Sequence, residues 1–344
     1  MKFSSNYIFY PDNKSLEQAI IHAKSMLPDD IAEDISPDNK VTVADNFLHT
    51  RGNFEQHRYS SKILESAREA LEAVLTGEFR DQESLAWAAT QNSLGNILGA
   101  LGQQQRDVAL FEEAIQCFNL ALEEYKQNEF PLDWAATQYN LGTAKQALGR
   151  QEGDSKLLKA SVDAYTSALL EWTREQMPLE WASTMHQLGA TFHAYGIVLK
   201  GNRNLQKSVV AYKNALAVLD ADNSALELAS AHNNRGVVLH NLAESEENTA
   251  RLEEAIRSYD TALTVCMEQQ LPIHLAVICR VNKSTARGEL AELTKDLALA
   301  EEAADEFELI PELFHASLQP LCLKHCEKQL KKAQLLAKEL SSNG

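Results

Sequence analysis

Three histidines are spaced so that they could share a proton or a metal ion. His186 lies two helical turns before His193 in the same predicted helix, and His240 follows His193 by 47 residues. Imidazoles at such intervals could act as acid and base or as metal ligands. No carboxylate or nucleophile accompanies them in the same register, which disfavours catalysis. We therefore expect a binding or structural role for these histidines.

A second group of potential ligands lies near the C-terminus, in the segment CLKHC. Cys322, His325 and Cys326 occupy positions i, i+3 and i+4, so one helical face would present two thiols and an imidazole, with His315 as a candidate fourth ligand. Zinc sites usually draw their ligands from two segments, whereas a helix that packs cysteines inward is common. The second interpretation is favoured, and no metal site is predicted.

The motifs of common enzymes do not occur in the sequence. It contains no phosphate-binding glycine loop, no Gly-x-Ser-x-Gly elbow and no Cys-x-x-Cys pair. We predict a protein that is not an enzyme and needs no cofactor. A metal or small-molecule enzyme built on the His and Cys clusters is the least favoured alternative.

Charge and composition restrict the partners and the compartment. Lys and Arg number 32 against 49 Asp and Glu, a formal net charge of −17, which disfavours nucleic acid and anionic membranes as partners. The N-terminal residues lack the features of a secretory signal, and no apolar run approaches a membrane-spanning length. Five scattered cysteines fit buried thiols in a reducing compartment. We expect a cytoplasmic protein.

An internal repeat must position all of these side chains, because the sequence recurs at a step of 47 residues. One column of the repeat holds the small residues Gly95, Gly142, Gly189 and Gly236. Another holds the large residues Phe118, Tyr165, Tyr212 and Tyr259. Apolar positions recur at intervals of three and four, which predicts two amphipathic helices per repeat. Small residues would let a neighbouring helix approach closely, and stacking would bury the face that one helix pair leaves exposed.

The landmarks of each unit follow a fixed order, shown by Leu94-Gly95, Ala114-x3-Phe118, Ala121-Leu122 and Pro131. This order resembles the tetratricopeptide repeat, a helix-turn-helix unit of 34 residues. The present unit is longer, so both helices are expected to be extended by about one to two turns. It is similar to the long-repeat variety of large bacterial multi-repeat proteins, over residues 38 to 313.

The resemblance implies an all-α fold, a right-handed α-solenoid of tetratricopeptide-like helix-turn-helix repeats with capping helices. An N-terminal segment with a short helix is expected at 1–37 and a C-terminal capping helix at 314–344. Degenerate repeats are expected at 38–84 and 273–313. Full repeats are expected at 85–131, 132–178, 179–224 and 225–272.

In tetratricopeptide proteins the first helix of each pair lines a concave groove. The resemblance therefore implies a set of groove residues by register from the Leu-Gly landmark. They are Asn92, Asn96, Tyr139, Thr143, Gln146, His186, His193, Asn233, His240, Arg280 and Arg287. Arg235 joins them as a candidate, because it stands in a column otherwise held by leucine. Either its guanidinium points into the groove, or its aliphatic part packs against neighbouring residues while the guanidinium reaches solvent.

Acids are absent from this set, in contrast with the acidic chain. We therefore predict a protein- or peptide-binding scaffold or adaptor whose groove grips an acidic or carboxylate-bearing segment with Arg280 and Arg287. The alternative for these two arginines is that they are ordinary solvated side chains. The alternative function is a regulatory sensor that controls a separate effector, since such arrays resemble those beside bacterial caspase-like proteases. The partner, the binding face and the oligomeric state stay open.

Overall fold

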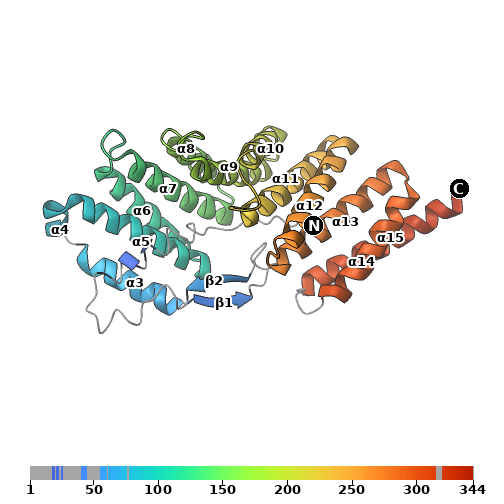
Figure 1. Ribbon diagram of the computed structural model, residues 1–344, viewed down its shortest axis with the longest axis horizontal. Helices are drawn as coiled ribbons and strands as arrows, with labels where there is room; N and C mark the ends of the chain where they lie inside the picture. The colour runs from blue at the N-terminus through green and yellow to red at the C-terminus, as the bar shows by residue number, and fades with distance from the viewer. Residues whose placement is uncertain are drawn as a thin grey trace. The chain divides into compact units, whose positions relative to one another are not determined.

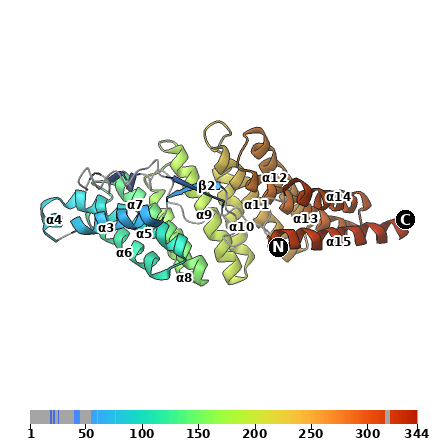
Figure 2. The same cartoon turned by 90° about the horizontal axis from the view of Figure 1, so that it is seen from below.

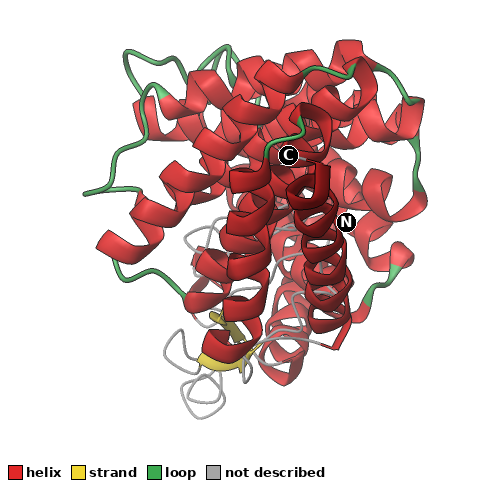
Figure 3. Cartoon of the chain, turned by 90° about the vertical axis from the view of Figure 1, so that its right-hand side faces the viewer, coloured by secondary structure: helices red, strands yellow, loops and turns green. Residues whose placement is uncertain are grey.

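The computed structural model describes residues 18–19, 21–22, 25, 40–44, 55–59, 61–75, 77–314 and 320–343. Helices make up nearly all of this part of the chain (Figure 3). The strands β1 (Lys40–Ala44) and β2 (Glu55–Tyr59) pair in a two-stranded sheet. The helices α3 (Ser61–Val74) and α4 (Gly77–Gln82) follow. The described residues of 38–84 therefore begin with strands and not with a long first helix, because β-branched residues in KVTVA favour a strand.

The rest of the chain is a series of helix pairs. The first helices all have 22 residues: α5 (Ser84–Gln105), α7 (Pro131–Glu152), α9 (Pro178–Leu199), α11 (Ala225–Glu246) and α13 (Ile273–Thr294). The second helices are α6 (Val108–Glu124), α8 (Ser155–Ala168), α10 (Asn202–Leu216), α12 (Thr249–Glu268) and α14 (Leu297–Phe314). A final helix, α15 (Pro320–Asn343), follows them.

The helices fall into two compact units. One unit comprises residues 8–43 and 57–199 and contains α3 to α9; the other comprises residues 1–7, 44–56 and 200–344 and contains α10 to α15. Within each unit every helix from α5 or α10 onward contacts the next one, and first helices of neighbouring repeats also touch (Figures 1 and 2). Successive helix pairs are thus packed as in an α-solenoid, and the predicted all-α solenoid fold is confirmed.

Short polar loops join the two helices of a pair. The first helix ends in a left-handed residue, such as Arg106 or Gly153, with φ of 57° and 67°. In the first two pairs an aspartate follows at once and caps the second helix: Asp107 accepts from the Ala109 N–H at 2.9 Å, and Asp154 from the Lys156 N–H at 2.7 Å. This loop reverses the chain within a few residues.

The glycine and aromatic columns meet in the pairs α5/α6, α7/α8 and α11/α12. A β-carbon built on Gly95 would lie 2.6 Å from Cε1 of Phe118, and one on Gly142 would lie 2.9 Å from Cδ1 of Tyr165. Phe118 and Tyr165 are completely buried. The glycines therefore set the close approach of the first helix to the second.

Candidate functional site

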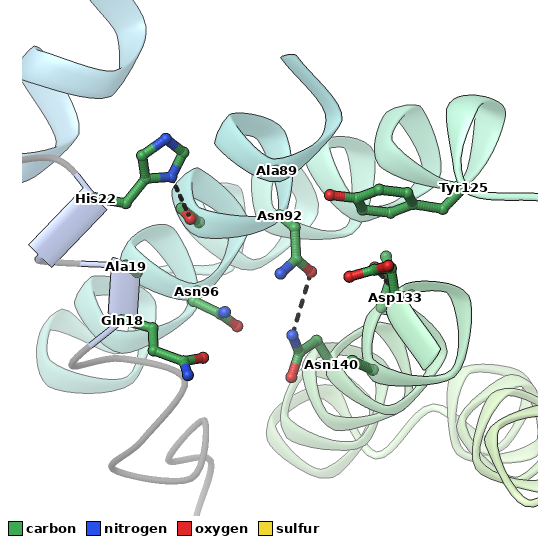
Figure 4. A pocket seen from close by; sticks show the side chains of 12 residues that line it. Gln18, Ala19, His22, Ala89, Asn92, Asn96, Tyr125, Asp133 and Asn140 are labelled. Carbon is green, nitrogen blue, oxygen red and sulfur yellow. Dashed lines mark hydrogen bonds between the residues drawn. The ribbon is translucent and has the colours of Figure 1, made fainter. Parts of the chain in front are cut away.

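A cavity of about 310 Å³ lies beside α5 and α7 (Figure 4). Three asparagines from the two helices line it: Asn92 and Asn96, one turn apart on α5, and Asn140 on α7. Tyr125, which follows α6, and Asp133, in the first turn of α7, complete the wall. The register of two neighbouring first helices therefore brings several amide groups to one place.

The amide groups are not equally satisfied. The Asn140 side-chain N–H donates to Oδ1 of Asn92 at 3.2 Å. Asn96 is 2% exposed, and its Oδ1 has no hydrogen-bond partner. A buried acceptor without a donor costs about 1–3 kcal/mol. The cavity therefore presents one acceptor that a ligand donor would satisfy.

The charge of the cavity wall is negative. Asp133 is exposed at the rim, and burial together with the Asp133 charge raises the pKa of Tyr125 to about 12. The phenol of Tyr125 is therefore neutral at physiological pH. Among the described lining residues Asp133 carries a negative formal charge. The wall therefore favours ligands with hydrogen-bond donors and cationic groups.

A helical part of the N-terminal segment forms another side of the cavity. Gln18, Ala19 and His22 line it, and Ala19 is 1% exposed within the core cluster that includes α3 and α5. Nδ1 of His22 lies 3.0 Å from Oγ of Ser93 on α5 (Figure 4). Burial lowers the pKa of His22. A helical segment of the same chain thus contacts α5 at Ser93.

Other predicted groove residues on α7 pack against side chains of their own repeat. The ring of Tyr139 lies 5.5 Å from that of Tyr165 and 5.4 Å from that of Trp172, between centroids. The Tyr165 hydroxyl donates to Oγ1 of Thr143 at 2.9 Å, with Oε1 of Gln146 at 3.3 Å. These side chains contact the second helix of their own repeat.

The two groove histidines on α9 are also buried. His186 and His193 are each 8% exposed. Burial lowers the pKa of His186 to about 4, so its ring is neutral near pH 7. Both histidines therefore lie mostly withdrawn from solvent.

In the second unit, Asn233 and Arg235 make defined contacts within the array. Oδ1 of Asn233 accepts from Nδ2 of Asn282 on α13 at 3.0 Å. Arg235 donates to Oγ of Ser258 at 2.6 Å and forms an ion pair with Glu254, both on α12. Neither interpretation of Arg235 anticipated this, because its head turns to the second helix of its own repeat.

Arg280 and Arg287, the proposed acid-gripping pair, are partnered by acids of α14. The Arg280 guanidinium lies 3.1 Å from a carboxylate oxygen of Glu306, and that of Arg287 lies 3.4 Å from Glu302. Both arginines are about a quarter exposed, at 23%. Their charges are therefore largely compensated within the chain.

His240 has carboxylates beside it, although none of them stands in the same register of the repeat as the histidines. Nε2 of His240 lies 2.7 Å from Oε2 of Glu289 on α13, and Glu244 follows it by one turn on α11. The i, i+4 spacing of His240 and Glu244 was a signal in the sequence. Glu289 could not be found by register, because it lies 49 residues away.

The C-terminal Cys/His segment packs into the core where its side chains are described. Cys326 is completely buried among residues such as Val281, Phe307 and Ile310. Nε2 of His325 lies 3.4 Å from Oγ1 of Thr285, and burial lowers the pKa of His325 to about 4. The side chains of Cys322 and His315 lie outside the described residues.

Comparison with known proteins identifies one segment of this helical array. Residues 87–130 match the family model of the tetratricopeptide repeat. The chain therefore carries a tetratricopeptide repeat, a unit whose arrays generally bind other proteins. No curated protein matches the chain. Within the described residues, none of the helices is both long enough and apolar enough to cross a membrane.

Proposed function

We propose that this chain is a scaffold or adaptor that binds a segment of another protein at the cavity beside α5 and α7. The repeat class supports this proposal, because its arrays work by presenting their stacked helices to partners. The cavity supports it as well, because it offers directional polar groups on rigid helices.

The observation that carries the proposal is the unpartnered Oδ1 of Asn96. A main-chain N–H of a peptide in this cavity would supply the missing donor. Asn92 and Asn140, already bonded to each other, offer further donors and acceptors beside it. Side-chain amides that bind the main chain of a peptide tolerate many different side chains on that peptide, which suits an adaptor.

The charge of the cavity indicates the kind of segment. Asp133 at the rim would pair with a Lys or Arg of the ligand, and the acidic chain would attract a basic segment over distance. We therefore propose a neutral-to-basic peptide as the occupant of this cavity.

Recognition of an acidic segment is a separate proposal that belongs to the other unit. It requires Arg280 and Arg287 to exchange Glu306 and Glu302 for the carboxylates of a ligand. A charge-swapped R280E/E306R variant keeps an ion pair of reversed polarity. If this proposal holds, the variant binds a polyglutamate peptide at least about tenfold more weakly than the wild type.

The main proposal is tested by selecting a displayed random-peptide library on the immobilised chain and measuring the affinity of selected peptides by fluorescence anisotropy. Replacing Asn96 by leucine removes the acceptor and should weaken binding by about tenfold or more. Asn119→Leu is the matched control, because Asn119 is exposed on α6 in the same repeat. Equal affinity for wild type and N96L would refute the cavity as the binding site.

A further inference from the structure

Three potential metal ligands meet on neighbouring first helices of the unit that contains α10 to α15. His240 and Glu244 lie one turn apart on α11, and Glu289 comes from α13. One ligand atom from each residue lies within 4.8 Å of those of the other two. The helices α11 and α13 are in contact, so the cluster is fixed by the packing of one repeat on the next.

The three side chains differ in exposure. The side chain of His240 is completely buried, that of Glu289 is 27% exposed, and Glu244 is exposed. An ion could therefore enter from the side of Glu244 and reach the imidazole at the inner end. The solvent side would leave room for water or a partner group in a further coordination position.

Tyr259 is placed to orient the imidazole. Its hydroxyl lies 3.5 Å from Nδ1 of His240, on the opposite side of the ring from Glu289. Without an ion, the 2.7 Å contact between Nε2 and Oε2 of Glu289 needs a proton between the two atoms. A metal ion would take the place of that proton, and the phenol oxygen could then accept a hydrogen bond from Nδ1–H, as in metal sites whose second imidazole nitrogen is held by a protein group.

We propose that His240, Glu244 and Glu289 bind a divalent transition-metal ion of the Zn²⁺ type, which joins α11 to α13. Imidazole with carboxylates suits Zn²⁺ and its first-row neighbours, whereas Mg²⁺ and Ca²⁺ prefer oxygen ligands alone. Metal bonds of about 2.0–2.2 Å place neighbouring tetrahedral ligands roughly 3.3–3.6 Å apart. Nε2 and Oε2, now 2.7 Å apart, need to separate by less than 1 Å, within reach of a side-chain adjustment at Glu289.

The test is isothermal titration of the full, chelator-treated chain with Zn²⁺, and separately with Mg²⁺ and Ca²⁺. We expect one Zn²⁺ per chain, with Mg²⁺ and Ca²⁺ at least about a hundredfold weaker. Glu244→Gln should weaken Zn²⁺ binding at least about tenfold without affecting folding, because Glu244 is exposed. Zn²⁺ should also raise the melting temperature of the wild type and not that of E244Q.

Two control variants make the outcome specific. Glu227→Gln changes an exposed glutamate in the first turn of α11 and should bind Zn²⁺ like the wild type. His325→Gln removes the imidazole of the C-terminal segment and should also leave Zn²⁺ binding unchanged. The proposal is overturned if no Zn²⁺ binds in a saturable way, if E244Q binds it like the wild type, or if H325Q abolishes the binding.

Discussion

The ring of Tyr259 lies against Gly236, so closely that a β-carbon on the glycine would be 2.6 Å from Cε1 of the tyrosine. Tyr259 is completely buried and also lies edge-on to the ring of His240, with centroids 6.4 Å apart. Its ring therefore has little space to move away from the glycine. The contact fixes the distance between α11 and α12.

The first prediction concerns this contact. Gly236→Ala should destabilise the chain by about 1–3 kcal/mol, because the overpacking outweighs the better helix propensity of alanine. Gly288→Ala is the matched control, because the nearest atom to its β-carbon would be Cβ of Ala303 at 3.8 Å. That variant should be neutral or slightly more stable. Urea denaturation followed by circular dichroism measures both, and equal stabilities of the two variants would contradict the prediction.

The second prediction concerns the left-handed residues at the ends of the first helices. Glu247 has φ of 49°, a conformation in which a side chain is strained and glycine is not. Glu247→Gly should therefore stabilise the chain by about 0.5–1 kcal/mol. Gly153→Ala, at the equivalent residue with φ of 67°, should destabilise it by about 1 kcal/mol. Thermal melts of the two variants should shift in opposite directions, and shifts of the same sign would count against the argument.

The third prediction concerns pH. Burial lowers the pKa of His186 from 6.5 to about 4, so the unfolded chain takes up a proton in this range before the folded one does. The stability that depends on neutral His186 is complete above about pH 6.5 and falls as the pH decreases toward 4, by about 3 kcal/mol for this group. His186→Gln should lessen the slope of stability against pH in that window. Denaturation at several pH values measures it, and an unchanged slope would refute the assignment.

The fourth prediction concerns the role of Thr143 and Gln146. The hydroxyl of Tyr165 donates a hydrogen bond to Oγ1 of Thr143 and lies within hydrogen-bond distance of Oε1 of Gln146. Tyr165 is completely buried. Tyr165→Phe should cost about 1–2 kcal/mol, because it leaves buried polar groups without their partner. Thr166→Ala, which removes an exposed hydroxyl bonded to the Val162 carbonyl, should cost less than about 0.5 kcal/mol. If the two changes cost the same, the hydroxyl is not a structural part of this repeat.

Much of the fold follows from the repeat in the sequence. The 47-residue recurrence predicts helix pairs, because it sets small residues of one helix at a fixed spacing from large residues of the next, where the two can pack together. Gly95 does lie against Phe118 in this way. The strands β1 and β2 were not predicted, since five-residue segments carry too little periodic signal to be recognised.

The site was harder to predict than the fold. Register identified which residues lie on the first helices, and Asn92 and Asn96 do line the cavity. It could not tell that Tyr139 and Thr143 are packed against Tyr165, because a first helix in a stack has neighbours on several sides. The pairing of His240 with Glu289 joins different columns of successive repeats, so a search within one column misses it.

The helix α15 presents a charged surface at one end of the described helices. α15 covers α14 and contacts α13, with Cys326 buried against the apolar side chains there. Many Lys and Glu residues in α15, such as Glu327, Lys331 and Glu339, are exposed. A further repeat or a second molecule would have to bury these charges in order to extend the array from this end.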